Sequence, residues 1–299
     1  MSLPPLIILT GPTGIGKSEI AVLLARQLKT EIISADSMQV YQDFHIGTAK
    51  PPPELREKVP HHLIDFVHPK EEYNVYLFKR DAERLMGDFH KTGKTPLVVG
   101  GTGLYIKALT DGLGCGSRPG DEIRRTVSEE MKIKGSEKMH EELALVDPVS
   151  AKSIKPNDRF RIQRALETYR ETGRPQSELH LEDQEKSAPK YKAICLVLNM
   201  PRENLYARIE KRVDSMLEMG LVREVEDLLE RGFQRDLKLF TGLGYKQVLA
   251  YLDGAESYET MVKNIKQETR RYAKRQLTWF RKIKDAHWIN IEEGEERGW

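Results

Sequence analysis

The chain has 299 residues, of which 39% are hydrophobic and 31% charged, and its formal net charge is +2. This length favours about two compact domains, and no apolar run approaches the ~18 residues that a membrane helix requires. The two cysteines, Cys115 and Cys195, are too few for a disulfide framework or a zinc site. The first five residues lack the charged and apolar regions of a signal peptide. We therefore expect a cytoplasmic protein with no part in a membrane.

Short apolar runs predict the strands of the fold. Four of them have the length of buried strands, at residues 6–9, 31–35, 96–99 and 193–198. A helical pattern follows the first run, with an apolar side made of Ile20, Leu23, Leu24 and Leu28. Strands that alternate with helices predict an α/β fold, in which a parallel sheet carries helices on both faces.

Residues 116–189 differ in composition and hydrophobic pattern from the rest of the chain. They are charged, show a helical pattern and contain no convincing strand. We expect them to form a helical insertion domain, which leaves residues 1–115 and 190–299 as an α/β core with a helical C-terminal region. Helices in that region are predicted at residues 204–218 and 221–230, separated by Gly220, and then onward to about residue 283.

Residues 11–18 fit the phosphate-loop pattern G-x-x-x-x-G-K-[ST] and lie between a predicted strand and a helix, as that motif requires. This predicts a P-loop NTPase-like core. Lys17 supplies a positive charge, the Ser18 hydroxyl is a candidate ligand for Mg²⁺, and the start of the helix adds its positive end. The residues expected to bind a diphosphate are Gly11, Pro12, Thr13, Gly14, Ile15, Gly16, Lys17 and Ser18.

Asp36 is the acid best placed beside this loop. Nucleotide hydrolases and kinases carry a second acid for Mg²⁺ at the end of another strand, but the strand at 96–99 ends in Gly-Gly-Thr. Asp36 follows the strand at 31–35, and the carboxyl ends of parallel strands form the ligand crevice of such sheets. It is a candidate general base or ligand of metal-bound water, and the structural alternative is an aspartate that caps a turn.

A basic block lies near the end of the chain. Residues 263–284 contain nine lysines and arginines and one acid, Glu268. Such a block favours a polyanionic partner such as nucleic acid, and a solvated helix face is the alternative. The apolar residues on the other side of this helix, predicted to pack inward, are Val262, Ile265, Tyr272, Phe280 and Ile283.

An ordered set of motifs resembles the bacterial tRNA dimethylallyltransferase family. The motifs occupy residues 11–18, 33–41, 46–51, 61–65, 99–105, 157–159, 164–167, 242–247 and 269–281. The resemblance implies transfer of a dimethylallyl group from dimethylallyl diphosphate to N6 of the adenosine 3′-adjacent to the anticodon, with release of diphosphate. It implies tRNA and dimethylallyl diphosphate as partners, and we expect Mg²⁺ as cofactor and a monomeric enzyme.

The resemblance also implies roles for particular residues. Asp36 matches the general base, Thr102 matches a residue that orients the adenine, and Arg212 or Arg208 is the diphosphate-contacting arginine, with Arg212 favoured. The positions that match tRNA contacts are Asp36, Ser37, Met38, Gln39, Thr102, Phe160, Arg161, Ile162, Gln163, Arg164, Gly242, Tyr245, Lys246, Gln247, Lys274, Arg275 and Gln276.

Three other functions remain open on the sequence. A sister enzyme that prenylates free AMP, ADP or ATP would share the site but would not need the basic block. A P-loop kinase of small molecules would use ATP and a second metal acid. A non-catalytic RNA-binding adaptor would explain the basic block but not Asp36 and Thr102 beside a phosphate loop.

Overall fold

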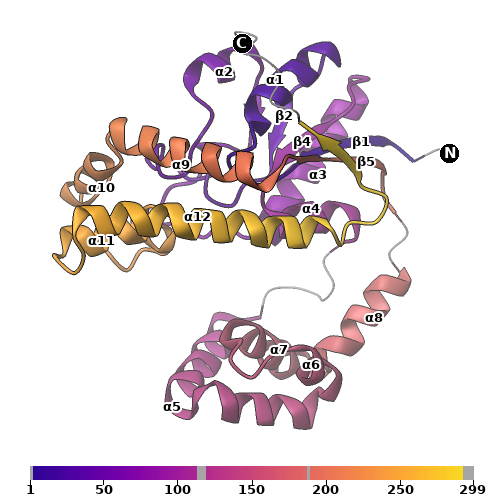
Figure 1. Cartoon of the computed structure of the whole chain (residues 1–299). Coiled ribbons are helices and arrows are strands. Elements are labelled where there is room, and N and C mark those ends of the chain that lie inside the picture. Colours follow the sequence, from indigo (N-terminus) through magenta and orange to yellow (C-terminus); the bar gives the residue numbers. More distant parts are fainter. Residues whose placement is uncertain (1–2, 113–118, 187–188, 292–299) are drawn as a thin grey trace. The chain divides into compact units, whose positions relative to one another are not determined.

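The computed structural model describes residues 3–112, 119–186 and 189–291. The chain divides into two compact units (Figure 1), one of residues Met1–Thr110 with Lys190–Trp299 and one of Asp111–Pro189. The boundary expected between residues 115 and 116 lies outside the described residues, and the observed division comes five residues earlier, at Asp111. Within the described residues, no helix combines the length and the apolar character needed to cross a membrane.

A parallel sheet forms the centre of the larger unit. Its strands in the described part of the chain are β1 (Pro5–Thr10), β2 (Ile32–Ser34), β3 (His61–His62), β4 (Leu97–Gly100), β5 (Lys192–Asn199) and β6 (His287–Asn290). They lie in the order β3-β2-β4-β1-β5-β6, and each pair of neighbours is parallel. The predicted α/β class with a parallel sheet is therefore confirmed. The sequence did not predict β3 or β6, because β3 has two residues and all four residues of β6 are exposed.

Helices surround this sheet. They are α1 (Lys17–Gln27), α2 (Pro53–Lys58), α3 (Val75–Lys91), α4 (Gly103–Thr110), α9 (Arg202–Glu218), α10 (Leu221–Glu230), α11 (Tyr245–Leu252) and α12 (Tyr258–Phe280), with a 3-10 turn η1 (Lys238–Thr241). The two helices predicted on either side of Gly220 are α9 and α10. Gly220 has a φ of 95°, a left-handed conformation that glycine adopts without steric cost.

Alternate residues of β1 face two different apolar cores. Ile8 packs in a cluster with Phe78 of α3, whereas Leu9 packs in a second cluster with Ala21 of α1. The predicted apolar side of α1 is wrong in part, because Leu23 and Leu28 are 41% and 38% exposed. The side of α1 that is buried carries Ala21, Val22 and Ala25. Small side chains allow this helix to lie close to the strands.

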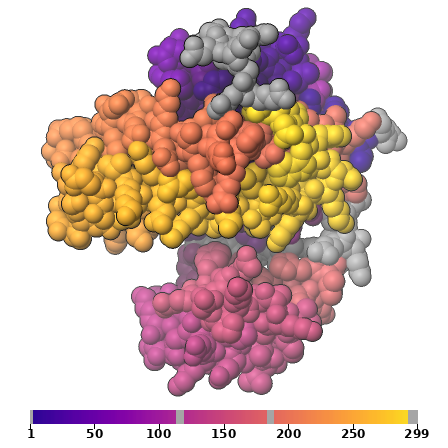
Figure 2. Space-filling model, viewed as in Figure 1, coloured from indigo at the N-terminus to yellow at the C-terminus, as the bar shows by residue number. Residues whose placement is uncertain are grey.

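The long helix α12 crosses the larger unit beside α9 and α11 (Figure 1). In the space-filling view, α9 in orange and α12 in yellow lie side by side over much of the visible face of this unit (Figure 2). Residues Ile265 and Phe280 of α12 are buried in the same core as Phe78, as the sequence predicts. This helix also approaches the start of α4, which follows the Gly-Gly-Thr segment.

The smaller unit is helical, and its described residues contain no strand. Its helices are α5 (Asp121–Val146), α6 (Pro148–Ser153), α7 (Arg159–Thr172) and α8 (Gln176–Lys186). Their core contains Met131, Leu143 and Ile162. Asp147 is buried between helices and accepts hydrogen bonds from the backbone N–H and the hydroxyl of both Ser150 and Ser177, so it joins the start of α6 to α8.

Candidate functional site

The phosphate loop connects β1 to α1, as the motif requires. Gly14 and Gly16 have φ angles of 83° and 91°, which disfavour any other residue. A Cβ on Gly14 would lie 2.8 Å from Cγ1 of Ile209, so the loop is pressed against α9. Helix α1 begins at Lys17 and directs its unpaired N–H groups toward the loop. The loop therefore has the conformation and the charge of an anion site.

Lys17 is held inside the loop. Its Nζ donates to the carbonyl oxygens of Gly11 and Pro12, both at 2.9 Å. The pKa of Lys17 is lowered to about 8, first by burial and then by the positive charge of Arg212, while the negative charges of Asp36 and Glu19 act in the opposite direction. The negative charge of a bound anion would raise this pKa again and so favour the protonated lysine. This is the behaviour expected of a lysine that binds phosphate.

Arg212 belongs to the same group of charges. Burial lowers its pKa, and Glu19 and Asp36 oppose this effect. Arg208, one turn earlier on α9, is exposed, and its Nη2 lies 3.1 Å from the position of a Cβ on Gly16. The structure therefore brings both arginines to the phosphate loop, with Arg212 partly buried near Lys17 and Asp36 and Arg208 at the solvent side.

Asp36 and Thr102 meet at the carboxyl ends of β2 and β4. Oδ1 of Asp36 accepts the N–H groups of Met38 at 2.9 Å and Gln39 at 3.2 Å, so this aspartate does cap a turn. Its Oδ2 makes no hydrogen bond within the described residues and stays open to a ligand. Thr102 donates its N–H to the carbonyl of Ala35 at 3.2 Å, and its Oγ1 accepts the N–H of Ser37 at 3.0 Å. These contacts fix the two loops side by side.

Gln276 of α12 joins the phosphate loop to the loop that carries Thr102. Its side chain is only 7% exposed and turns toward the loops, so the RNA contact expected at this position stays a prediction. Oε1 accepts the N–H of Thr13 at 2.8 Å, and Nε2 donates to the carbonyl of Gly101 at 2.9 Å. A local sequence pattern cannot reveal this role of Gln276, because its hydrogen-bond partners lie 263 and 175 residues away in the chain.

Tyr272 is a site residue that the sequence analysis placed only in the packing stripe. Burial raises the pKa of its hydroxyl, and the charge of Asp36 raises it further. The hydroxyl therefore lies within electrostatic reach of the candidate base. In the sequence, an aromatic residue at helical spacing looks the same whether it packs in the core or lies beside the site, so Tyr272 could not be recognised.

Two further positions that the resemblance assigns to RNA contacts are buried in this structure. Tyr245 is fully buried and its hydroxyl donates to Glu224 at 2.7 Å. Ile162 is fully buried in the smaller unit. Their side chains are thus held in the packing of the protein, and their contacts with RNA stay predictions. Gln247 is partly buried and its Oε1 accepts the N–H of Gly244 at 3.0 Å.

The other positions keep accessible surface and remain predictions. Phe160 and Arg161 at the start of α7 are exposed, as are Lys246, Lys274 and Arg275 of the larger unit. Partly buried positions are Ser37, Met38, Gln39, Thr102, Gln163, Arg164 and Gly242. The predicted RNA positions are thus divided between the two units, with residues 160–164 on the helical insertion.

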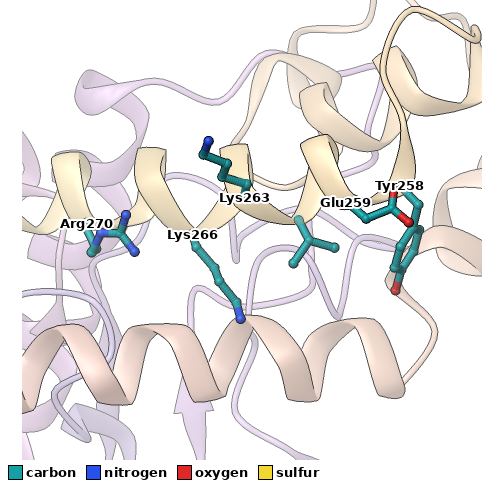
Figure 3. A pocket seen from close by; sticks show the side chains of 6 residues that line it. Tyr258, Glu259, Lys263, Lys266 and Arg270 are labelled. Carbon is teal, nitrogen blue, oxygen red and sulfur yellow. The ribbon is translucent and has the colours of Figure 1, made fainter.

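The basic residues at positions 263–284 do not all lie on one free face. Lys266 donates to Asp214 of α9 at 2.8 Å, and Arg270 pairs with Glu210 of the same helix. Figure 3 shows Lys266 pointing from α12 toward the neighbouring helix, while Lys263 points away from it, along a cavity of about 430 Å³. Arg271 pairs with Glu268. The prediction that all nine basic residues lie on the free side of the helix is therefore wrong for Lys266 and Arg270, whereas Arg271 stays exposed beside its partner. The seven that remain exposed are Lys263, Arg271, Lys274, Arg275, Arg281, Lys282 and Lys284.

A parallel sheet with a phosphate loop at its carboxyl edge defines a P-loop α/β protein with an anion site beside a carboxylate. Within that class, the chain belongs to the IPP transferase family, whose family model matches residues 39–283. A second model, described as isopentenyl transferase, matches residues 4–65. The resemblance stated from the motifs is confirmed.

Relatives of this chain carry consistent names. A tRNA dimethylallyltransferase 2 from Geotalea uraniireducens is 48% identical over 289 residues, which are 96% of this chain and 93% of that protein. A tRNA dimethylallyltransferase from Acetivibrio thermocellus is 45% identical and covers 96% of this chain and 92% of its own length.

Solved structures agree with the sequence relatives. The full-length tRNA isopentenylpyrophosphate transferase from Bacillus halodurans has a TM-score of 0.71 at 38% identity, over 97% of this chain and 91% of that one. A eukaryotic dimethylallyltransferase, captured acting on tRNA, has a TM-score of 0.84 at 31% identity, over 97% of this chain and 74% of that one.

Proposed function

We propose that this chain transfers a dimethylallyl group from dimethylallyl diphosphate to N6 of the adenosine 3′-adjacent to the anticodon of tRNA, and releases diphosphate. The observation that carries the proposal is the grouping of Lys17, Arg212 and Asp36. Their charges act on one another, so cations for a leaving diphosphate and an acceptor for a proton share one site. The names of the family members support the choice of donor and acceptor.

The reaction requires cations that stabilise the leaving diphosphate and a base that accepts the N6 proton. The N6 lone pair attacks C1 of the dimethylallyl group, and the bond between C1 and the diphosphate oxygen breaks with its electron pair on oxygen. Lys17, Arg212 and the backbone N–H groups of the loop stabilise the charge that develops there. A carboxylate oxygen of Asp36 takes the N6 proton. Adenine N6 is a weak nucleophile, since its lone pair is delocalised, and a base within hydrogen-bond reach lowers the barrier.

Asp36 is suited to this task by the way its two oxygens are used. Oδ1 is held by the N–H groups of Met38 and Gln39, which orients the carboxylate. Oδ2 is then aimed without a competing partner in the described residues. Thr102, fixed to the same turn through Ser37, is placed to orient the adenine.

The RNA reaches the site as a single-stranded loop. An adenine must leave the anticodon stack to enter such a site, and enzymes that act on bases commonly extrude them. The exposed cations Lys274 and Arg275 lie on the turn of α12 that also carries Gln276. We assign them to backbone phosphates, which position the RNA without reading its sequence.

Magnesium fits the donor set at the loop. Mg²⁺ is typically held by one or two protein oxygens together with waters and substrate phosphates, and the Ser18 hydroxyl follows Lys17 at the start of α1. The described residues contain no group of three or more metal-binding side chains, so Ser18 would hold the ion together with the diphosphate. When bound, the ion would neutralise charge on the leaving group. We propose that the enzyme is a monomer and that it acts in the cytoplasm.

One assay separates the candidate functions. The protein is incubated with labelled dimethylallyl diphosphate and either unmodified tRNA, AMP or ATP. Label in tRNA alone is the expected result. Label in AMP or ATP but not in tRNA would identify the sister activity on free nucleotides. ATP hydrolysis coupled to turnover would identify a kinase, and RNA binding without transfer of label to any acceptor would identify an adaptor.

A further inference from the structure

Gln276 lies where α12 meets both loops of the site. Thr13, whose N–H it accepts, belongs to the diphosphate loop, and Gly101, whose carbonyl it binds, directly precedes Thr102. One buried amide thus connects the loop of one substrate to the loop of the other.

The packing around this amide leaves little freedom. A Cβ on Gly101 would lie 2.5 Å from Nε2 of Gln276, and one on Gly103 would lie 2.3 Å from Cδ1 of Trp279. Real Cβ atoms do not approach other heavy atoms so closely, so only glycine permits this contact. Helix α12 therefore rests directly on the loop, and a displacement of the helix must move the loop or break the hydrogen bonds of Gln276.

The outer side of the same turn is cationic. Lys274 and Arg275 directly precede Gln276 and are exposed. Neither has an acidic partner within the described residues, and the guanidinium of Arg275 lies 5.8 Å from the centre of the Tyr272 ring. A single helical turn thus presents two cations to solvent and one amide to the catalytic loops.

We propose that Gln276 is a positioning residue that couples the binding of RNA to the binding of diphosphate, an inference that rests on the proposed function. Phosphates bound at Lys274 and Arg275 restrain the motion of α12. Through its two hydrogen bonds, Gln276 then restrains Thr13 and Gly101 as well. The diphosphate loop then loses less conformational freedom when its ligand binds. The coupling is reciprocal, so diphosphate tightens RNA binding by the same factor.

The test measures this factor without turnover. Calorimetry gives the dissociation constant of inorganic diphosphate for the full chain, with and without a saturating unmodified anticodon stem–loop RNA. The wild type should bind diphosphate about 5- to 150-fold more tightly with RNA, the usual range of such coupling. Gln276→Met removes both hydrogen bonds at nearly constant length, and its factor should fall below about 2.

Ile265→Val is the matched control. Ile265 is buried in the same helix, about three turns before Gln276, and this change removes one methyl group without removing a hydrogen bond. This variant should keep the wild-type factor. Equal factors in the wild type and Gln276→Met, no effect of RNA on the wild type, or an equal loss in Ile265→Val would each overturn the inference. A wild type that binds no RNA would overturn the proposed function as well, which the labelling assay reports independently.

Discussion

The hydroxyl of Tyr245 donates a hydrogen bond of 2.7 Å to Oε1 of Glu224, and the same carboxylate accepts the N–H groups of His45, Ile46 and Gly47. This contact anchors the loop at residues 45–49, whose carbonyls bind the amide of Gln39. Gln39 in turn donates its N–H to Asp36. A buried contact far from the phosphate loop therefore supports the turn that holds the candidate base.

Tyr245→Phe should lower the free energy of unfolding of the larger unit by about 1.5–3 kcal/mol, the usual contribution of a hydrogen bond to a charged group. Urea unfolding followed by tryptophan fluorescence measures this change, because Trp279, Trp288 and Trp299 all belong to that unit. Tyr251→Phe is the control, since the Tyr251 hydroxyl has no hydrogen-bond partner in the described part of the chain, and its effect should stay within about 0.5 kcal/mol. Equal effects of the two changes would show that the anchor adds no stability.

Asp36→Asn should lower kcat by about 10²–10⁴-fold, the usual effect of losing a general base. An asparagine oxygen can still accept the N–H groups of Met38 and Gln39, so the turn is kept and only the proton acceptor is lost. Affinity for tRNA should remain close to that of the wild type. Single-turnover kinetics and RNA binding measure the two effects, and a variant with more than about a tenth of the wild-type kcat would refute the assignment of Asp36 as base.

Diphosphate affinity should fall as the pH rises above about 8, because the lowered pKa of Lys17 lies there. Below this pH the free lysine is protonated and attracts the anion, and above it binding must also take up a proton. The expected loss of diphosphate affinity approaches about tenfold per pH unit. The quantity to compare is the ratio of affinities of the wild type and Lys17→Met, because the ionisation of diphosphate itself cancels. Lys17→Arg, charged at every such pH, should give a ratio independent of pH, and a flat ratio for the wild type would contradict the prediction.

Removal of Lys274 and Arg275 should flatten the salt dependence of tRNA binding. Each phosphate contact on single-stranded RNA contributes a log–log slope of about −0.7, so the double alanine variant should lose roughly one to two units of slope. The matched control is the double alanine variant of Lys266 and Arg270, two cations of the same helix that pair with Asp214 and Glu210. Its slope should stay near that of the wild type. Affinities measured between about 50 and 200 mM salt decide the comparison, and a similar slope for both variants would show that the exposed cations do not contact phosphates.

Local patterns were sufficient for the framework of the site. The strand before residue 11, the glycine spacing and Lys17 form a motif whose geometry depends only on neighbouring residues, so its position and its role as an anion site were predictable. Asp36 and Thr102 follow apolar runs, and the rule that parallel strands end at one edge brings them together. The helices α9 and α10 were predictable because Gly220 separates two clear helical patterns.

Tertiary structure decided which polar side chains turn inward. Lys266 and Gln276 stand in the basic segment of α12, and each finds a partner in another part of the chain, at Asp214 and Thr13. Tyr245 of α11 likewise finds its partner at Glu224. Helical periodicity defines the faces of one helix but not the residues that pack against each face. A polar side chain is buried only where a partner compensates the loss of water, and that partner lies up to 263 residues away. The sequence by itself therefore determined the class of fold and the anion site, whereas packing of distant segments decided which residues of α12 remain free for RNA.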